Sequence, residues 1–439
     1  MCPPAAPTHL SAPFDNRAAT SEKRAMRMAR FSSWIHRVVG RLLPGLAATF
    51  FFASRPGALA ADWPQWRGPT RDGISVESGW GTTWGAGGPK VLWRASFGTG
   101  CSSITVAENR VYTMGNRKNI DTVYCVDAAS GKPLWSYSYP SKLDPNQFEG
   151  GPGGTPAIDG PRVYTLSRQG RLLCLSEGKV LWSKNLTSDF GATEPQWGFA
   201  GSPLVLGDRL LLDVGGPGAS AVALNKLTGA LIWKSGHDEA SYSSPVVVQP
   251  GEDATVAFLN AAALVVRRAR DGRELWRYPW KTSYDVNAAT PIIHRDAIFI
   301  SSGYGHGGAL VRPSAAGATA VWENREMRNH INSSVLWQGH LYGFDESALK
   351  CLDAATGKLK WRQGGLGKGS LIIADGKLVI MSENGKLVIA RTSPEKYQVV
   401  AEAQVLSKER CWVVPTLTDG RIFCRNNEGE AVALDVRLN

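Results

Sequence analysis

Short apolar runs alternate with turn-forming residues along most of the chain beyond residue 90. In 371–380 and in 415–423, two apolar runs flank an Asp-Gly pair, Asp375-Gly376 and Asp419-Gly420. Such spacing predicts β-hairpins, because Gly, Asp and Asn readily adopt the backbone angles of tight turns. Six further hairpins are predicted around Glu108-Asn109, Asp159-Gly160, Gly207-Asp208, Pro250-Gly251, Arg295-Asp296 and Gln338-Gly339.

A second unit, in which a Gly stands four residues before a Trp, follows these hairpins. It is clearest in 126–135 (Val-Asp-Ala-Ala-Ser-Gly-Lys-Pro-Leu-Trp) and in 352–361 (Leu-Asp-Ala-Ala-Thr-Gly-Lys-Leu-Lys-Trp). The five pairs are Gly131 and Trp135, Gly178 and Trp182, Gly229 and Trp233, Gly272 and Trp276, and Gly357 and Trp361. Degenerate copies end at Trp93 and Trp322, and successive Trp residues lie 39 to 51 positions apart. That period is typical of a four-stranded propeller blade.

Eight hairpins and eight outer-strand segments, the last at 397–401, predict an all-β, eight-bladed β-propeller of four-stranded antiparallel blades. The chain ends in an apolar strand, 431–435, that no Gly–Trp unit follows. The missing outer strand is 91–94, near the other end of the propeller segment. We therefore expect the N- and C-terminal strands to pair within one blade, which removes the open sheet edge.

The first 60 residues have the order of a secretory signal peptide. A basic stretch, 26–41, precedes a short apolar run, 42–53, and the small residues 58–60 precede a predicted cleavage after Ala60. Met26 or Met28 would each give a leader of more ordinary length. The predicted organisation is a leader, 1–60, and one propeller domain, 61–439. The mature chain is expected to be periplasmic or secreted, without a transmembrane segment, and a monomer.

The net charge of +11 does not indicate a nucleic-acid partner. The leader carries +6, and the remaining +5 is spread over residues 61–439 without a run of Lys or Arg. Cys125, Cys174 and Cys351 occupy the same place in three repeats, which favours small core residues over a disulfide framework. Cys101 and Cys411 are each expected to open an innermost strand, in neighbouring blades, and whether they pair is left open.

The repeat Ala/Leu-x-Asp-x-x-Thr-Gly-x-x-x-Trp resembles the tryptophan-docking repeat of pyrroloquinoline quinone (PQQ) propeller proteins. The opening of the mature chain, 62–69 (Asp-Trp-Pro-Gln-Trp-Arg-Gly-Pro), resembles the start of exported PQQ-like repeat proteins. That family includes the quinoprotein alcohol dehydrogenases and a non-catalytic group with the scaffold lipoprotein of the outer-membrane barrel-assembly machinery. The resemblance covers nearly all of 62–439. It implies the fold and leaves the activity open, because the repeat is structural.

Long loops gather on the face opposite the tight turns, and such a face usually carries binding residues. A mixture of aromatic, amide, acidic and basic residues is expected to ring the channel mouth there, as a polar ligand would require. A second interpretation is that these side chains only close the channel by bonding loop backbone. The candidates are Trp197, Phe199, Tyr242, Asp285, Asn287, Tyr304, His306, Asn329, His330, Lys368, Arg410 and Trp412.

Two other patterns do not support a site. The run 303–308 satisfies G-x-G-x-x-G, but a strand and not a helix is expected after it, so we interpret it as a hairpin loop. The histidines His237, His306 and His330 come from separate blades without metal-ligand spacing, and no metal site is predicted.

The resemblance to quinoprotein dehydrogenases implies a Trp beneath the quinone, a calcium on Glu, Asn and Asp oxygens, and an Asp base. Trp197, Asp285 and Asn287 could fill parts of this set, but the Cys-Cys pair common in those enzymes is absent. The sequence favours a non-catalytic exported propeller without PQQ or calcium, which binds an envelope protein, peptide or polysaccharide. A PQQ-dependent alcohol or sugar dehydrogenase is the alternative.

Overall fold

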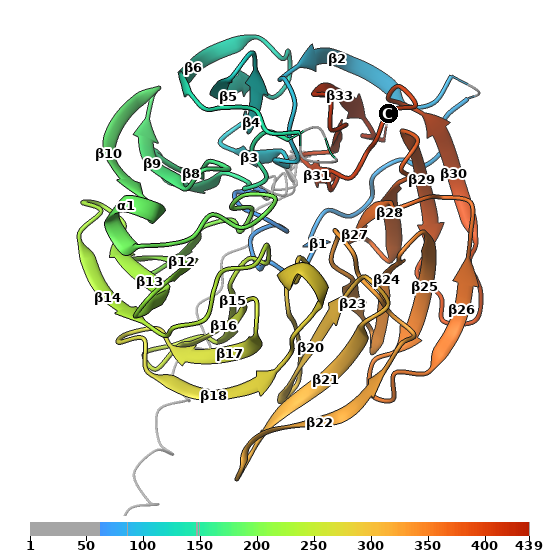
Figure 1. Cartoon of the computed structure of the whole chain (residues 1–439). Helices are drawn as coiled ribbons and strands as arrows, with labels where there is room; N and C mark the ends of the chain where they lie inside the picture. The colour runs from blue at the N-terminus through green and yellow to red at the C-terminus, as the bar shows by residue number, and fades with distance from the viewer. Residues whose placement is uncertain (1–61, 86, 146–147, 149, 439) are drawn as a thin grey trace, which may run out of the picture. The chain divides into compact units, whose positions relative to one another are not determined.

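The computed structural model describes residues 62–85, 87–145, 148 and 150–438, so the predicted leader 1–60 lies outside it. Eight β-sheets surround a central axis like the blades of a propeller (Figure 1). The helices of the described residues are α1 (Leu186–Phe190) and the 3-10 turn η1 (Ser283–Asp285). Neither has the length and apolar character needed to cross a membrane. The predicted all-β, eight-bladed propeller is confirmed.

We number the blades 1 to 8 in the chain order of their innermost strands. These innermost strands are β3 (Thr105–Ala107), β7 (Ala157–Asp159), β11 (Leu204–Leu206), β15 (Val246–Gln249), β19 (Ile292–His294), β23 (Val335–Trp337), β27 (Ser370–Ala374) and β31 (Thr416–Thr418). The second strands are β4 (Arg110–Arg117), β8 (Arg162–Leu166), β12 (Arg209–Gly216), β16 (Thr255–Leu259), β20 (Ala297–Ser302), β24 (His340–Asp345), β28 (Lys377–Met381) and β32 (Arg421–Arg425).

The two outer positions of each blade complete an antiparallel sheet. The third strands are β5 (Ile120–Asp127), β9 (Arg171–Ser176), β13 (Ala219–Asn225), β17 (Ala263–Arg268), β21 (Gly307–Ser314), β25 (Ala348–Asp353), β29 (Lys386–Arg391) and β33 (Glu430–Asp435). The outer strands are β6 (Pro133–Pro140), β10 (Lys179–Asn185), β14 (Leu231–Ser235), β18 (Glu274–Pro279), β22 (Gly317–Asn324), β26 (Leu359–Gln363), β30 (Val399–Gln404) and β2 (Lys90–Ser96).

Blade 8 is built from both ends of the propeller segment, as predicted. The outer strand β2 pairs antiparallel with β33, and Val91 lies opposite Leu434. A β-bulge follows, so that Trp93 lies opposite Ala433. Because this pairing joins the last blade to the first strand of the ring, no blade lacks its outer strand.

The core lies between the faces of adjacent blades. Second and third strands such as β28 and β29 are almost wholly buried, whereas outer strands such as β18 alternate between exposed and partly buried residues. Cys125, Cys174 and Cys351 are fully buried in this core, which confirms their interpretation as small core residues. Each lies opposite the Trp of its own blade on the neighbouring strand.

The Trp of one blade packs on the Gly turn of the next. Trp233 Nε1 donates to the carbonyl of Ala269 at 2.9 Å, and a Cβ on Gly272 would stand 2.4 Å from the Trp233 ring. Gly272 also has φ 73°, which a side chain would strain further. Similar indole-to-carbonyl bonds of 2.7–3.2 Å join Trp93 to Ala128, Trp182 to Lys226, Trp322 to Ala354 and Trp361 to Ser393.

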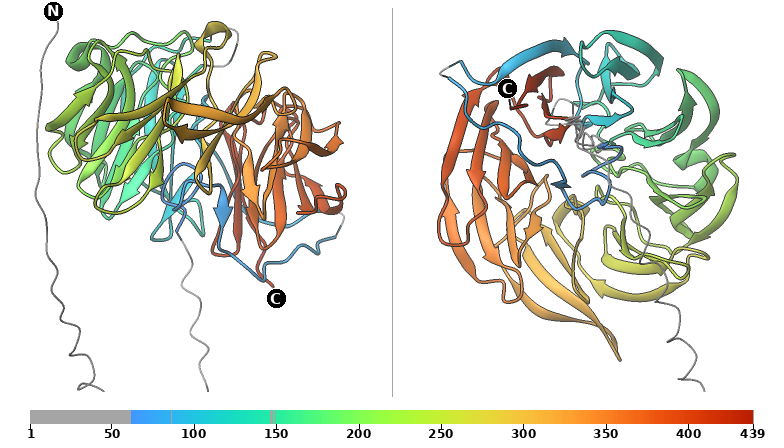
Figure 2. Two further views of the ribbon diagram at one scale, coloured as in Figure 1. Left: turned by 90° about the horizontal axis from the view of Figure 1, so that it is seen from below. Right: turned by 180° about the vertical axis from the view of Figure 1, so that it is seen from behind.

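The sequence did not predict the course of segment 62–77. Segment 62–77, which precedes β2 in the chain, crosses the central channel, as the blue ribbon seen from behind shows (Figure 2). Trp63 forms an antiparallel bridge with Val106, and β1 (Ile74–Ser75) pairs in parallel with β27 as a fifth strand of blade 7. We call 62–77 the axial segment.

Candidate functional site

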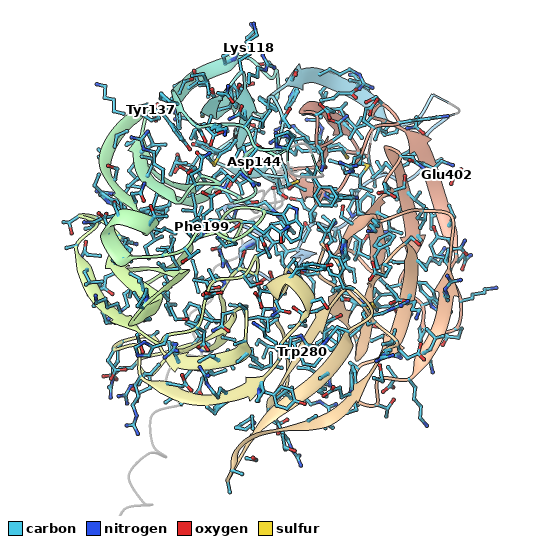
Figure 3. All side chains as sticks on the ribbon, in the orientation of Figure 1. Lys118, Tyr137, Asp144, Phe199, Trp280 and Glu402 are labelled. Atoms are coloured by element: carbon cyan, nitrogen blue, oxygen red, sulfur yellow. The ribbon has the colours of Figure 1, made fainter. Side chains whose placement is uncertain are left out.

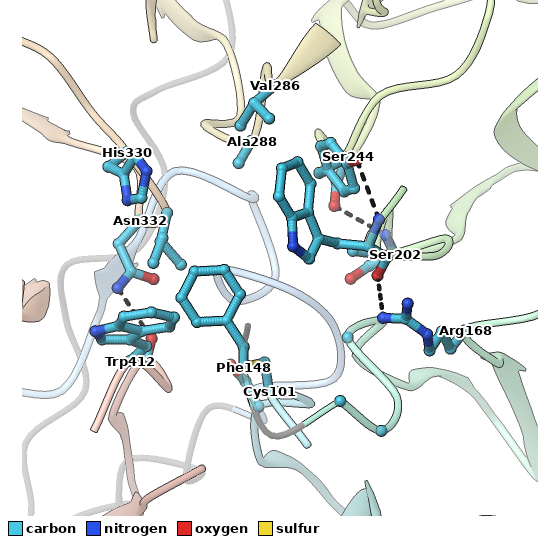
Figure 4. A pocket seen from close by; sticks show the side chains of 18 of the residues that line it. Cys101, Phe148, Arg168, Ser202, Ser244, Val286, Ala288, His330, Asn332 and Trp412 are labelled. Atoms are coloured by element: carbon cyan, nitrogen blue, oxygen red, sulfur yellow. Dashed lines mark hydrogen bonds between the residues drawn. The ribbon is translucent and has the colours of Figure 1, made fainter. Parts of the chain in front are cut away.

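A pocket opens where the long loops that lead into the innermost strands meet the axis (Figure 4). It encloses about 1140 Å³ of space, open solvent included. Its aromatic lining comes from several blades, and the remaining walls are mostly small residues. Asp144, which is labelled in Figure 3, also belongs to the lining. The aromatic lining residues are Trp66, Phe148, Trp197, Tyr242, Tyr304, His330 and Trp412.

Five of the predicted candidates line this pocket: Trp197, Tyr242, Tyr304, His330 and Trp412. The Trp197 and Tyr242 rings are 6.0 Å apart between centroids, and the Tyr242 hydroxyl accepts a bond from the Trp197 backbone N–H at 3.3 Å. The Tyr304 and His330 rings meet edge to face at 4.6 Å. Burial raises the pKa of Tyr242 to about 12, so its hydroxyl stays protonated at neutral pH.

Two further candidates support the lining from behind. Lys368 Nζ lies 3.3 Å from His330 Nδ1, and burial together with this ammonium lowers the pKa of His330. The Arg410 guanidinium lies 4.7 Å from the centre of the Trp412 ring, a cation–π contact. Trp412 Nε1 donates to Glu383 Oε1 at 3.0 Å. The polar edge of Trp412 is thereby bonded within the protein.

The remaining candidates do not line the pocket, and for three of them the structure corrects the prediction. Phe199, Asn287 and Asn329 are each at most 2% exposed. Phe199 packs in the core between blades 2 and 3, because the chain turns inward directly after Trp197.

The two asparagines bond to loop backbone. This agrees with the second interpretation given above, in which such side chains only close the channel. Asn287 Nδ2 donates to the carbonyl of Asn260 at 2.7 Å, and Asn329 Nδ2 donates to that of Phe344 at 3.0 Å. Asp285 forms an ion pair with Lys281, and His306 meets Trp280 edge to face at 4.4 Å. Residues 303–306 form the turn between β20 and β21, and Gly307 and Gly308 begin β21, so a strand and not a helix follows, as expected.

An exposed aromatic pair extends the rim beside Trp197. Tyr284 is 65% exposed and Tyr304 41% exposed, and their rings lie 5.7 Å apart. Both have a left-handed backbone, with φ of 60° and 53°. That conformation is uncommon for a bulky residue and costs about 1–3 kcal/mol, so the surrounding loops hold these rings out against a local preference.

Sequence reasoning missed the polar wall of the pocket. Arg168 is 4% exposed; its guanidinium donates to the Trp197 carbonyl at 2.6 Å and to Asp144 at 3.1 Å. Hydroxyls also link neighbouring blades: the backbone N–H of Thr155 donates to Ser202 Oγ at 3.0 Å, and that of Ser202 to Ser244 Oγ at 2.9 Å. The signal was present, because a Ser or Thr precedes a Pro before four consecutive innermost strands, at 155–156, 202–203, 244–245 and 290–291.

The pocket does not fit a calcium-bound quinone. Calcium takes six to eight oxygen ligands, usually with several carboxylates, whereas Asp144 is the only acidic residue among the described lining residues and it faces Arg168. No group of three or more His, Cys, Asp or Glu side chains elsewhere in the described chain could hold a metal. Cys101 and Cys411 are not joined; their Sγ atoms bond to Asn427 Nδ2 and the Glu409 carbonyl.

A buried carboxyl near this face makes stability depend on pH. Asp213 on β12 accepts one bond, from the Ser241 N–H at 3.2 Å, and burial raises its pKa from 3.8 to about 7. Between about pH 4 and pH 7 the Asp213 carboxyl is protonated in the folded chain but ionised in the unfolded chain. The stability due to Asp213 is therefore fully present below about pH 4 and is lost as the pH rises through 7.

We expect Asp213→Asn, which cannot ionise, to become more stable relative to the unmodified chain as the pH rises from about 4 to about 8. The relative gain is at most about 4 kcal/mol, the equivalent of three pKa units. Urea unfolding of both chains at both pH values measures it. An equal effect of the substitution at the two pH values would contradict the assignment.

Comparisons with known proteins agree with the fold. BamB from Moraxella catarrhalis is 15% identical, with a TM-score of 0.59 over 79% of this chain and 99% of that chain. Quinohemoprotein alcohol dehydrogenases from Comamonas testosteroni and Pseudomonas putida HK5 are 12% and 11% identical, with TM-scores of 0.61 and 0.64. Each of the two alignments covers 86% of this chain and 80% of the enzyme. At these identities the likeness shows the fold alone.

The sequence comparisons identify a family. No curated protein matches the chain. A family profile described as "Outer membrane protein assembly factor BamB" matches residues 119–363 and 345–437, which together make up more than half of the sequence and span blades 1 to 8. By this match the chain belongs to the PQQ_2 family of propeller repeat proteins.

Proposed function

We propose that this protein is a non-catalytic binding protein of the cell envelope, which holds a segment of a partner protein in the aromatic pocket of its loop-rich face. The observation that carries the proposal is the state of the pocket's polar groups. Trp412 Nε1 is bonded to Glu383 and the Arg168 guanidinium to Asp144 and Trp197. What remains for a ligand is mainly aromatic faces, which bind without reacting.

The envelope location and the protein partner rest on two supports. The family is described as an outer-membrane protein assembly factor, and the predicted leader with cleavage after Ala60 would export the chain. Aromatic faces also bind sugars, so a polysaccharide is the alternative partner. We further propose that the protein works without PQQ or calcium, in keeping with the donor set described above.

A photo-crosslinker placed at Tyr284, on the exposed rim, tests the partner. With envelope extract, we expect a crosslink to a polypeptide that a crosslinker at Trp337 does not form. Trp337 ends β23 at the opposite, tight-turn face, so it serves as the control for crosslinking away from the loop-rich face. Equal crosslinking from both faces contradicts the proposal, and a crosslink to carbohydrate replaces the protein partner by a polysaccharide.

In the same assay we expect Trp197→Ala to lower the crosslinked fraction at least about fivefold, because the side chain lines the pocket and contacts Tyr242 and Tyr284. Trp337→Ala should leave the fraction unchanged. A dye-linked alcohol oxidation assay with added PQQ and calcium completes the test. Stoichiometric quinone binding with turnover would overturn the non-catalytic proposal.

A further inference from the structure

The axial segment touches all eight blades. It bonds to their innermost strands or to the residues directly before them, although it belongs to no repeat. Backbone bonds tie it to Val106, Ile158 and Ile373 at 2.8–2.9 Å. Side-chain bonds of 2.5–2.9 Å tie it to Pro203, Pro245, Thr290, Ser334 and Leu417.

Two buried arginines hold this segment in place. Arg67 donates to the Ser334 carbonyl at 2.8 Å, and Arg71 donates to the Pro203 and Pro245 carbonyls at 2.5 Å. Burial lowers their pKa values to about 10 and about 9, so both remain charged at neutral pH. Bonds from a charged donor to buried carbonyls are strong, and breaking them would leave the carbonyls without partners. The segment is therefore a fixed part of the channel.

The axial segment also supplies a lining residue of the pocket. Trp66 is partly exposed, lies among the lining residues and donates from Nε1 to Thr290 Oγ1 at 2.8 Å. Because the indole N–H is bonded, what Trp66 can offer a ligand is its ring. In Figure 4 the pale blue ribbon of the early chain passes beneath the labelled side chains. Trp66 is thus the residue through which the axial segment contributes to the pocket lining.

Resting on the proposed function, we propose that Trp66 contacts the ligand at the bottom of the pocket. The pocket then takes one aromatic side chain of an extended protein segment, inserted end-on, and does not thread a chain through the channel. The lining favours this class: its large side chains are mainly aromatic and stand among small residues, and Asp144, the acidic residue among the described lining residues, forms an ion pair with Arg168. A charged group would lose hydration there without gaining a partner of opposite charge.

The test uses the peptide acetyl-Gly-Gly-Trp-Gly-Gly-amide and the same peptide with Glu in place of Trp. By calorimetry, we expect the unmodified protein to bind the first and not the second. Trp66→Ala should weaken binding about tenfold or more, the loss of one aromatic contact. Trp84→Ala is the matched control, because Trp84, like Trp66, packs against the core of blades 7 and 8 but does not line the pocket. Should Trp66→Ala not fold, Thr290→Val removes only the bond that orients the indole and should weaken binding several-fold.

The outcomes separate this inference from the proposed function. Unchanged peptide binding by Trp66→Ala or Thr290→Val, with binding lost in Trp197→Ala, overturns the role of Trp66 and leaves the proposed function standing. Failure of the unmodified protein to bind the Trp peptide, with rim crosslinking intact, overturns the aromatic-insertion proposal alone. Binding of a disaccharide such as cellobiose in place of the peptide also overturns it. Loss of rim crosslinking is the result that overturns the proposed function itself.

Discussion

Replacing Trp233 by alanine is expected to lower the free energy of unfolding by about 3–5 kcal/mol, the usual cost of deleting a large buried aromatic side chain. Trp233 is 8% exposed, donates to the Ala269 carbonyl at 2.9 Å and packs on Gly272 of the next blade. The substitution leaves a cavity at the joint between blades 3 and 4 and removes the donor to a carbonyl there. The midpoint of urea unfolding, followed by circular dichroism, measures the loss.

Leu275→Ala is the control for this substitution. Leu275 precedes the Trp of the next outer strand, and it is 44% exposed. Surface substitutions of this kind change stability by about 0.5 kcal/mol or less. If Trp233→Ala shifted the midpoint no more than Leu275→Ala does, packing between blades would not be the main source of stability.

Replacing Arg425 by alanine should cost about 3–5 kcal/mol as well, because it opens the joint where the ring closes. Arg425 on β32 of blade 8 is 1% exposed. Its hydrogen bonds go to strand β4 of blade 1 and to the residues between β2 and β3. The guanidinium donates to the carbonyls of Ser102, Met114 and Gly98 at 2.6–2.9 Å. Removing it leaves these buried carbonyls without their donor.

The same blade offers a matched arginine. Arg94 on β2 pairs with Glu430 at 2.9 Å, but its side chain is 48% exposed. Since exposed ion pairs contribute about 0–1 kcal/mol, Arg94→Ala should be nearly neutral. Thermal unfolding of the two variants compares them directly. Equal losses of stability in the two variants would contradict the prediction that the buried bonds of Arg425 stabilise the joint between blades 8 and 1.

The axial segment crosses the channel (Figure 2) and supplies one residue of the pocket lining. A propeller channel lined by innermost strands alone would be open at both faces. Here Arg67 and Arg71 anchor a segment across it, and Trp66 lies on the pocket side of that segment. In the proposed mode of binding, the pocket takes a single side chain, and loops such as the one carrying Tyr284 contact the rest of the partner.

Part of the site could be predicted from the chain alone. Trp197, Tyr242 and Trp412 were identified because they precede innermost strands, and that position faces the channel mouth in any propeller. Phe199 has the same position but turns into the core, since two residues of irregular loop suffice to reverse the direction of a side chain. Asn287 and Asn329 look like ligand-binding amides in the sequence, yet their amides are used up by loop carbonyls.

The repeat period, the Gly–Trp units and the strand missing from the last repeat determined the number of blades and the way the ring closes. These features are local: each depends on turn chemistry and on a hydrophobic pattern within about 50 residues, which a sequence displays directly. The course of segment 62–77 was decided only by the tertiary structure. Its partners lie up to 343 positions away, as in the bond from the Gly420 N–H to Glu77, and the carbonyl acceptors of Arg67, Arg71 and Ser75 carry no residue-type signal. The contribution of Trp66 to the pocket lining follows from that course.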